Sequence, residues 1–538
     1  MLQAAPGFET LALNRVTFGA RESDVARVRA IGWPAWVDGQ LAPPAGDDPD
    51  LAQHLSTQRM RIRYVGQPPT KNITGWPDVD RLRPLDYLRS SVGQLWDLVR
   101  RVEDSVAANE LVRIQEELAA ANWIRNTHST FQLREFMADF WNTHFNVGRQ
   151  ADQFGAAALP DYDTNVIRPR VFGNFRDLLG AVARSAAMLK YLNNAESTAD
   201  RPNENYAREL LELHTLGGDA YLGVSAGTRP RVFPSLASTY SSGFTDGDIL
   251  ATSRALSGWT VMQGQLAPGG RLPFTGQFIY NPIQHNPNAG AFLGFDLAPL
   301  TAPMQQGEAV LDMISASPIT ARFIVGKLAR RMFGDSPPAA VITRGFGAWI
   351  EHRQKSDQIA RVLKSMLLDG PEIGVGYDGA AKVRRPYERI IAFLRATDTI
   401  VNAFDLAVTA AAALGDGLYA WPTPEGRPDT DAQWLSTSAN LYNWNLLLLI
   451  LDLPQIRTSL AAQTPPDATA SATTIVEYWV GRLVGYALRP AAMTALINDA
   501  AQPFGVIAAY RSGGIANIER ALRRQVALIA SSPEFGRR

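Results

Sequence analysis

Apolar residues recur three and four positions apart along most of the chain, with charged residues between them. In the opening segment, Val25, Val28 and Ile31 follow this pattern, which predicts two short helices that end before Gly32. A longer pattern between residues 82 and 138, rich in Glu and Arg, predicts a pair of helices or more. Further helices are predicted at residues 175–192, 205–216, 245–256, 318–332, 357–368, 384–403, 432–451, 472–484, 491–500 and 518–530.

The residue-by-residue alternation that is typical of β-strands is scarce. A short β pair is predicted only at residues 271–280, RLPFTGQFIY, where aromatic and β-branched residues gather. Residues 43–50 and 67–79 are rich in Pro, Gly and Asp and are predicted to be surface loops. The sequence therefore predicts a mainly α fold, a large multi-helix domain with long loops and at most a small β element.

One large helical domain over residues 1–538 is the expected organisation. Within it we distinguish an N-terminal helical part (1–150), a central part that carries most motifs (151–300) and a C-terminal helical part (301–538). The central part contains a Gly-, Ser- and Pro-rich connection at residues 218–242, and loops of this length are usually inserted or functional. No internal repeat of fixed period is found, so a solenoid is not supported.

Composition narrows the classes of function. The 538 residues include 52 basic and 52 acidic side chains, so the chain lacks the positive charge that favours nucleic acid as a partner. It has no Cys, which excludes disulfides, thiolate metal sites and cysteine nucleophiles. No apolar run approaches the roughly 20 residues that span a bilayer, and the first residues lack the basic and apolar regions of a signal peptide. We expect neither nucleic-acid binding nor a membrane span.

The segment 201–217, RPNENYARELLELHTLG, carries the densest group of chemically active residues. At about 100° per residue, Glu204, Arg208 and Glu212 form one stripe of a helix, and Glu209 lies beside it. Closely spaced carboxylates raise the pKa of one group and leave another ionised, as general acid–base catalysis requires. The same side chains also fit a ladder of salt bridges one helical turn apart. Both interpretations stay open at this point.

His144 stands in FMADFWNTHFNV, among Phe and Trp residues that form an aromatic helical face. A buried imidazole needs a hydrogen-bond partner, and we expect a carboxylate from Glu209 or Glu212. His144, His214 and Glu209 would also offer the nitrogen and oxygen ligands of a zinc, manganese or iron site. His214 and Glu209 point about 140° apart on one straight helix, which argues against both binding one ion. A hydrogen-bonded histidine is therefore favoured, with a divalent metal as the alternative.

Polar and aromatic residues outside this helix are candidates for binding a substrate. The loop at residues 280–294, YNPIQHNPNAGAFLG, is rich in Asn, His, Pro and Gly, and loops of this kind often carry function. Trp259 is a candidate platform for stacking a sugar, with core packing as the alternative. The full set of candidate substrate-binding residues is Asn142, Asn203, Trp259, His285 and Asn286.

Several common catalytic signatures are absent. The chain has no G-x-x-x-x-G-K-[ST] and no H-E-x-x-H sequence. GVSAG at residues 223–227 matches the letters of G-x-S-x-G but runs into TRPRVFP and not into a helix. No glycine-rich turn joins a predicted strand to a helix. P-loop, zincin, α/β-hydrolase and dinucleotide-binding functions are therefore not supported.

Motifs along the chain resemble, in order, those of a large bacterial family known as domain of unknown function eighteen-hundred. They are WNTHFNV, PNENYARELLELHTLG, ARFIVGKL, VRRPYERIIAFLRA, WPTPEGRPDTDAQWLS and LIASSPEFGRR, and the opening LNRVTFGARESDVARVRAIGWPAWVDGQL is similar too. The resemblance implies a mostly helical bacterial protein, often exported to the periplasm or the outside. It also implies a second exported family, sulfatase-like or phosphatase-like, as a source of partners. It implies no settled reaction.

Three positions depart from the pattern of that family. HNPNAGAFLG stands where the family reads H-D-x-G-x-K-x-x-L-G, so Asn286 replaces an acid and Gly290 replaces a lysine. Asn193 in YLNN replaces an aspartate, and residues 218–242 include an additional segment. Either the chemistry rests on the helix at 203–214 and His144, or this member has changed an ancestral activity.

Three functions are compatible with these residues. The first is an acid–base hydrolase or lyase acting on a carbohydrate or another hydroxyl-rich polymer, with the catalytic residues Glu204, Glu209, Glu212, Arg208 and His144. The second is a non-catalytic exported scaffold or partner subunit. The third is a metal-dependent oxidoreductase with His and Glu ligands. We favour the enzyme with acid–base chemistry.

Overall fold

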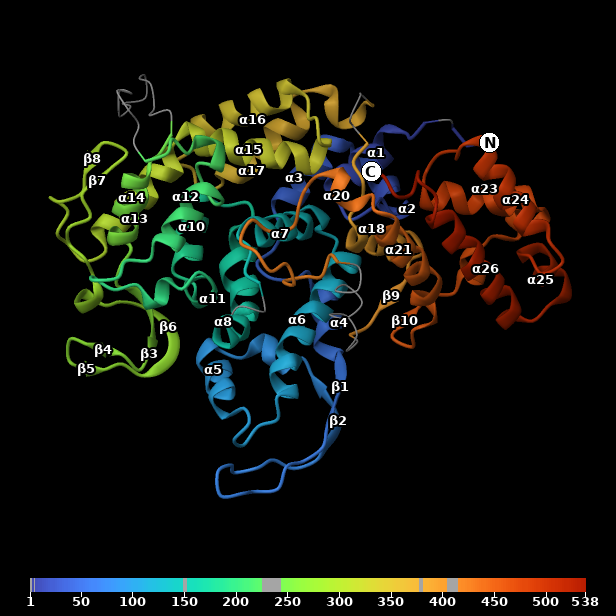
Figure 1. Ribbon diagram of the computed structural model, residues 1–538. Helices are drawn as coiled ribbons and strands as arrows, with labels where there is room; N and C mark the ends of the chain where they lie inside the picture. Colours follow the sequence, from blue (N-terminus) through green and yellow to red (C-terminus); the bar gives the residue numbers. More distant parts are fainter. Residues whose placement is uncertain (1, 4, 149–151, 225–242, 377–380, 404–414) are drawn as a thin grey trace.

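Helices form most of the secondary structure in the computed structural model, which describes residues 2–3, 5–148, 152–224, 243–376, 381–403 and 415–538. The first part of the chain contains α1 (Phe8–Val16), α2 (Glu22–Ile31), α3 (Trp33–Leu41), α4 (Pro49–Thr57), β1 (Arg59–Tyr64), β2 (Val79–Pro84), α5 (Val92–Arg101), α6 (Asn109–His128) and α7 (Gln132–His144). The strands β1 and β2 pair in an antiparallel hairpin that projects from the helical body at the bottom of Figure 1.

The central part combines short helices with small β hairpins. It contains α8 (Gln153–Ala157), α9 (Leu159–Asp161), α10 (Phe175–Ala183), α11 (Ala186–Tyr191), α12 (Glu204–Glu212), α13 (Asp246–Ala255), β3 (Trp259–Gln263), β4 (Leu266–Ala267), β5 (Gly270–Arg271), β6 (Phe274–Tyr280), β7 (Ala291–Phe292) and β8 (Phe295–Asp296). The predicted β pair is confirmed, because β6 pairs antiparallel with β3, with Trp259 opposite Tyr280. Of the predicted insertion at 218–242, residues 225–242 lie outside the described part.

The last part is again helical. It contains α14 (Gln305–Ala316), α15 (Pro318–Phe333), α16 (Ala339–Glu351), α17 (Gln358–Leu368), α18 (Pro386–Ala396), β9 (Ile400–Val401), α20 (Asp431–Trp434), α21 (Thr437–Leu449), β10 (Ile456–Arg457), α22 (Leu460–Gln463), α23 (Ala472–Leu483), α24 (Pro490–Ala501), α25 (Val506–Ser512) and α26 (Ile515–Ala530). Figure 1 places α15 to α17 along the top of the view, α14 at the left beside α13, and α23 to α26 at the right.

Two helices at the centre of the molecule are buried on nearly every side. Every residue of α18 is buried, and so is α7 from Gln132 to Trp141. A helix that is apolar all round lies inside a large protein, yet both helices also carry charged side chains, including Asp139 and Glu388, into this interior. Those charges need partners there, and they organise the site described below.

The helix that contributes most to this site, α15, has clear start and stop signals. Ser317 caps its first turn by accepting a hydrogen bond from the backbone N–H of Ile319, and Pro318 fits the first helical position. Gly334 ends the helix with φ at 96°, a conformation that glycine adopts without strain. Its apolar side, which includes Ile324 and Leu328, is fully buried.

Some predicted boundaries were wrong. The helical pattern predicted from residue 82 begins only at Val92, because Leu82 belongs to β2. In β1 the sequence RMRIRY alternates exposed arginines with buried Met60 and Ile62, a period-two signal that the charged residues obscured. The helix predicted over 384–403 ends at Ala396, and the β-branched residues that follow form β9 and pair with β10.

One cluster of buried apolar side chains extends through all three parts of the chain, from Ala12 in α1 to Phe535 after α26. The partition into three parts stays a prediction. Within the described residues, no helix is by itself long and apolar enough to cross a membrane, and one bent pair, α14 with α15 at 59°, meets the length and composition test jointly.

Candidate functional site

A buried network of arginines and carboxylates joins α7, α15, α18 and the loop at residues 415–430. Asp139 of α7 accepts a hydrogen bond from Arg331 at 3.0 Å and also pairs with Arg385 and Arg427. Despite burial, these three guanidinium groups lower the pKa of Asp139 to about 2. The side chains of Asp139, Arg331, Arg385 and Arg427 are each at most 5% exposed, so the network is shielded from solvent.

Further carboxylates balance the arginines of this network. Glu388 of α18 pairs with Arg331 and stands 3.2 Å from Arg385. Asp416 lies 3.2 Å from Arg427 and accepts a hydrogen bond from the backbone N–H of Tyr387. Each buried arginine therefore has at least one carboxylate partner, as buried charges require.

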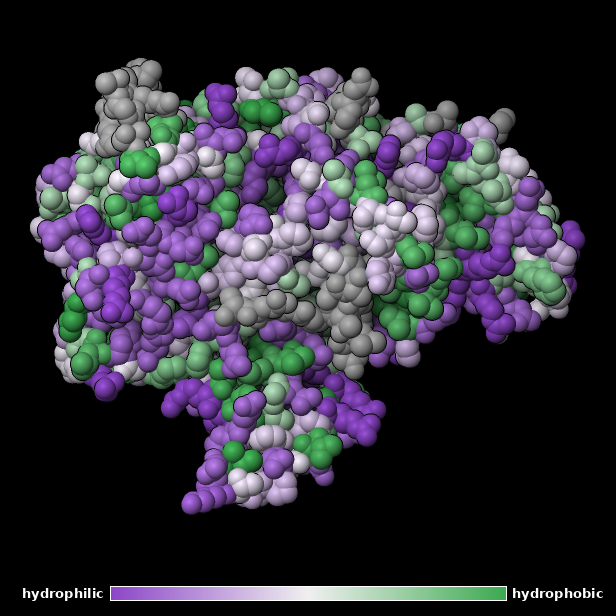
Figure 2. All heavy atoms as spheres, viewed as in Figure 1, coloured by the Kyte–Doolittle hydropathy of each residue, from purple (hydrophilic) through white to green (hydrophobic). Residues whose placement is uncertain are grey.

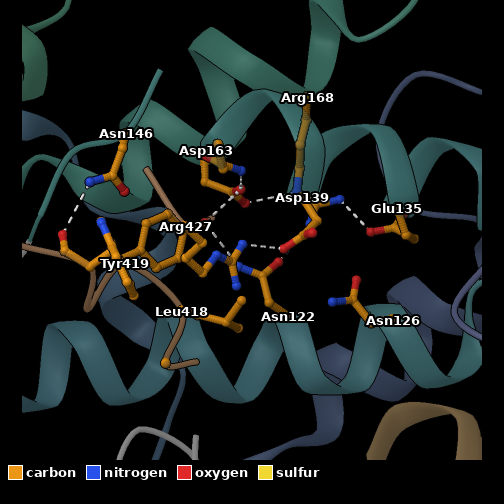
Figure 3. A pocket seen from close by; sticks show the side chains of 13 residues that line it. Asn122, Asn126, Glu135, Asp139, Asn146, Asp163, Arg168, Leu418, Tyr419 and Arg427 are labelled. Atoms are coloured by element: carbon orange, nitrogen blue, oxygen red, sulfur yellow. Dashed lines mark hydrogen bonds and ion pairs between the residues drawn. The ribbon is translucent and has the colours of Figure 1, made fainter. Parts of the chain in front are cut away.

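A small polar chamber lies on one side of the network (Figure 3). Arg168 reaches between Asp163, at 2.7 Å, and Glu135, at 2.6 Å, and its third nitrogen donates to Asn122. The chamber encloses about 20 Å³, room for about one water molecule. It is too small for a sugar. Its lining residues are Asn122, Asn126, Glu135, Asp139, Asn142, Asn146, Asp163, Arg168, Gly417, Leu418, Tyr419, Trp421 and Arg427.

A larger cavity of about 280 Å³ also borders Asp139 and Arg427. Its wall is formed by the end of α7, one face of α15 and the segment 425–430, which contributes Glu425, Gly426, Arg427, Pro428, Asp429 and Thr430. Gly426 brings this segment against α7 with φ at 74°, and a Cβ atom there would stand 1.9 Å from the carbonyl oxygen of Thr143. Only glycine permits this close approach of the two backbones.

His144 and Lys327 form a hydrogen-bonded pair on the wall of this cavity. The Nε2 atom of His144 lies 3.1 Å from the backbone carbonyl of His214 and must donate to it, because a carbonyl oxygen only accepts. The Nδ1 atom then accepts, and Lys327 donates to it across 3.0 Å. Burial, together with the nearby positive charge of Lys327, holds the pKa of His144 well below its usual value. The imidazole is therefore neutral with one defined tautomer.

Lys327 is poised between its two protonation states near neutral pH. Burial lowers the pKa of its ammonium group to about 8; Arg330 lowers it further, whereas the carboxylate of Asp429 opposes the shift. An amine with this pKa is partly deprotonated at neutral pH and can take up a proton. Sequence reasoning did not propose this residue.

The structure gives His144 a different partner from the one predicted. We expected a carboxylate of Glu209 or Glu212, but α12 ends at Glu212 and the following turn presents the carbonyl of His214 instead. Both ring nitrogens of His144 are engaged by these contacts. In the described part of the chain, no three His, Asp or Glu side chains are arranged to hold a metal ion, and this includes His144, His214 and Glu209.

The carboxylates of the predicted stripe on α12 have different surroundings and partners. Arg208 pairs with Glu212 at 3.0 Å and with Asp246 at 3.4 Å, as in the salt-bridge interpretation, and Glu204 is exposed in the first turn of α12. Glu209 is half-buried, and this burial together with Glu212 and Glu425 raises its pKa. Glu209 is thus coupled to Glu425, a residue of the cavity wall.

The candidate substrate-binding residues lie in structural roles. Trp259 is fully buried and packs under the guanidinium of Arg184, so it presents no face to a ligand and the core-packing alternative holds. Asn203 caps α12 by accepting from the backbone N–H of Tyr206. Asn142 donates to Asp163 in the small chamber.

The loop that carries His285 and Asn286 is held by local hydrogen bonds. The Nδ1 atom of His285 lies 3.0 Å from the carbonyl oxygen of Ser257, and the side chain of Asn286 donates to the carbonyl of Ala199. Neither residue lines the cavity beside Lys327. The structure therefore does not bring the predicted loop and the predicted helix together in one site.

Comparison with known proteins gives one match. Residues 11–537 match the family described as Protein of unknown function (DUF1800). The chain belongs to this family. No curated protein and no solved structure matches it. Membership of DUF1800 confirms the resemblance drawn from the motifs and assigns no reaction.

Three DUF1800 motifs contain several of the cavity and network residues that sequence reasoning missed. ARFIVGKL ends with Lys327 and Leu328, VRRPYERIIAFLRA includes Arg385 and Glu388, and WPTPEGRPDTDAQWLS includes Glu425, Arg427 and Asp429. Charged residues within these apolar or Pro-rich segments were the sequence feature that could have indicated a buried site. Their spacing along the sequence does not show that they meet.

Two of the three positions that depart from the DUF1800 pattern have a backbone conformation that suits the residue present. Asn193 has φ at 59°, a left-handed conformation in which Asn and Asp are the best tolerated residues after glycine. Gly290 has φ at 81°, where glycine is free of strain. These residues fit their local backbone, and neither lies on the cavity wall.

Proposed function

We propose that this protein is an acid–base enzyme, a hydrolase or lyase acting on a carbohydrate or another hydroxyl-rich substrate, with its active site in the cavity beside Lys327. The observation that carries the proposal is the chain of hydrogen bonds from the carbonyl of His214 through His144 to Lys327, which ends at this cavity. A catalytic base oriented by a second group, which is itself held by a third, is the arrangement common to many active sites.

Each residue of this arrangement has a separate task. The amine of Lys327 is the base, because its lowered pKa makes the neutral form accessible. His144 is a positioning residue: it stays neutral, accepts one N–H of the amine, and leaves the nitrogen lone pair free for a substrate proton. Glu425 on the wall and Glu209 behind it supply carboxyl groups, of which Glu209 has the raised pKa of a proton donor.

The test compares substitutions of Lys327 that keep or remove its charge. Lys327→Arg keeps the positive charge but cannot lose its proton, and Lys327→Met removes both. We expect each to reduce cleavage of a panel of neutral and acidic polysaccharides at least about 100-fold, the usual lower range for a catalytic base. Lys364→Met is the matched control, since Lys364 lies on the surface at 51% exposure. Wild-type activity in both variants would overturn the proposal.

A second measurement needs no substrate. Nuclear magnetic resonance of protein labelled at the lysine ε-carbons gives the pKa of Lys327 directly, with Lys327→Met identifying the signal. The expected pKa is about 8. A value near the ordinary 10.4 would show an amine unsuited to act as a base at neutral pH and would remove the basis of the proposal.

A partner-binding role is a second candidate, favoured by one surface of α21. Its side chains Leu441, Tyr442, Trp444, Leu448 and Leu449 are between 41% and 62% exposed, and Figure 2 shows hydrophobic residues gathered in this region of the molecule. Exposed groups of this kind often mark contacts with other proteins. An exported sulfatase-like or phosphatase-like protein, with both chains in the periplasm or outside the cell, is the partner that the resemblance implies.

The α21 surface is tested by substitution and co-purification. Trp444→Ser should abolish co-purification with such a partner, whereas Phe504→Ser, which removes a 90% exposed side chain elsewhere, should leave it unchanged. Equal recovery of the partner by both variants would count against α21 as the contact.

A further inference from the structure

One side of α15 supplies three cationic groups to the cavity. Lys327, Arg330 and Arg331 are three and four residues apart, so they lie on the same face of the helix, and all three line the wall. Arg331 is neutralised by Asp139 and Glu388. Arg330 makes no ion pair with any described residue, although it is only partly exposed.

The carboxylates of the cavity are engaged elsewhere. The wall has five basic and three acidic side chains, and Asp139 is taken up by its three arginines. Asp429 stands 3.3 Å from Lys382, and Glu425 accepts a hydrogen bond from the hydroxyl of Thr423 at 2.6 Å. Arg330 therefore brings a positive charge to the cavity that no group of the described chain cancels by direct contact.

A guanidinium group in this position is suited to an anionic group of a ligand. Its planar pair of N–H donors matches the two oxygens of a carboxylate, and such pairs are stronger than neutral hydrogen bonds. The cavity volume of about 280 Å³ lies near the lower end of ligand sites and corresponds to about one sugar unit. Glu425 and Thr430 are exposed at its edge, where the rest of a chain-like substrate would continue.

The chemistry of Lys327 as the base also favours one of the two proposed reaction types, hydrolysis and elimination. Most glycoside hydrolases use two carboxyl groups that flank the scissile bond, and an amine is not part of that arrangement. A neutral amine is a general base that can remove a proton from carbon, and Lys327 lines the cavity on the same helix face as Arg330. A carbon-bound proton becomes acidic enough only when an adjacent carboxylate is neutralised by a nearby cation.

We propose that the substrate is a carboxylated sugar unit, that Arg330 binds its carboxylate, and that Lys327 begins a β-elimination that cleaves the polymer without water. This inference rests on the proposed function and selects the lyase from its two reaction types.

The reaction balances without a cofactor or an oxidant. The amine of Lys327 takes the proton from the carbon that bears the carboxylate. The electron pair left on that carbon forms a double bond to the next carbon, and the bond from that carbon to the glycosidic oxygen breaks. The departing oxygen receives a proton from the ammonium group that Lys327 has become, which returns the amine to its neutral form. The products are one unsaturated sugar end and one free hydroxyl end.

The experiment uses polygalacturonate, alginate and hyaluronan, each beside its carboxyl-reduced, neutral form. We expect wild type to produce ends that absorb ultraviolet light, because the new double bond is conjugated with the carboxylate, from at least one acidic polymer and from no reduced form. Arg330→Met should lower this rate at least about 100-fold, as loss of a transition-state charge contact does. Arg322→Met is the matched control, on the same helix but exposed outside the cavity.

The outcomes separate this inference from the proposed function. Cleavage that yields reducing ends without ultraviolet absorbance, or equal cleavage of the reduced polymers, would overturn the lyase inference and leave an acid–base hydrolase. Full activity in Arg330→Met, with an unchanged melting temperature, would also overturn it, as would the absence of cleavage of every acidic polymer. Full activity in Lys327→Met would instead overturn the proposed function.

Discussion

The substitution Asp139→Asn tests whether the buried ion network is as desolvated as the structure shows. The side chain keeps its shape but loses the charge that faces Arg331, Arg385 and Arg427. The pKa of Asp139 falls from 3.8 to about 2, and at 1.36 kcal/mol per unit this corresponds to about 2 to 3 kcal/mol. Removal of one partner from a buried pair costs about 3 to 5 kcal/mol, because the remaining charges stay buried. We expect a loss within that range.

The assay is urea unfolding at neutral pH, followed by tryptophan fluorescence and circular dichroism. Asp80→Asn serves as the control: Asp80 pairs with Arg61 at 2.6 Å, but the two side chains are 45% and 58% exposed, so solvent screens the pair and the loss should be far smaller than for Asp139→Asn. If Asp139→Asn unfolded within about 0.5 kcal/mol of wild type, the network would be solvated and the reasoning wrong.

The sign of the pH effect gives a second measurement on the same residue. Because the folded pKa of Asp139 is depressed, its contribution to the free energy of unfolding is complete above the unfolded pKa of about 3.9 and is lost as the pH falls toward about 2. Wild type should lose stability over this interval more steeply than Asp139→Asn. Parallel curves for the two proteins would contradict the assignment.

Three further predictions concern the cavity and its supporting backbone. The pKa of Lys327 is near 10.4 in the unfolded chain and about 8 in the folded chain, so the unfolded chain binds more protons between these pH values and stability should rise with pH there. Lys327→Met should reduce this rise, as measured by melting temperatures at several pH values. Asn193→Ala should cost about 1 kcal/mol in chemical unfolding and Asn193→Gly almost nothing, because φ is 59°; equal effects would argue against backbone strain. Gly426→Ala should lower the free energy of unfolding by about 2 to 3 kcal/mol, because the new Cβ atom would stand 1.9 Å from the Thr143 carbonyl oxygen. Gly347→Ala, in open space on α16, should raise it by roughly 1 kcal/mol. If both substitutions raised stability in thermal unfolding, the 425–430 segment would not be held against α7.

Local features of the fold could be predicted from the sequence, because they depend on neighbouring residues. Asn203 and the PNENYA sequence define the start of α12, and the spacing of Ile324 and Leu328 defines the buried side of α15. The single β pair with enough aromatic residues was also recognised. The β1 strand was missed because arginines occupy its exposed positions, and these charges obscure the alternation of exposed and buried residues.

The composition of the site could not be predicted in the same way. His144 and Lys327 are 183 residues apart, and no periodicity relates them. His144 itself was identified from its aromatic surroundings, but its hydrogen-bond partner depends on where α12 ends. The helix ends at Glu212, and the turn that follows places the carbonyl of His214 beside the ring. Trp259 and Asn286 have the chemistry of ligand-binding residues, and their actual roles in packing and loop closure follow from tertiary contacts alone.

The long separation between Asp139 and Arg427 also has a consequence for how the protein is made. The arginine partners of Asp139 follow 192, 246 and 288 residues later in the chain, so the network is complete only after 288 more residues have been added. At about 5 to 20 residues per second, a ribosome needs roughly 15 to 60 s to add that length. During this time α7 holds a carboxylate that cannot be buried alone, so the centre of the molecule cannot close until most of the chain has been synthesised. We therefore expect nascent chains of this protein to expose the apolar side chains of α7 during this time, and exposed apolar surface of this kind is what chaperones bind.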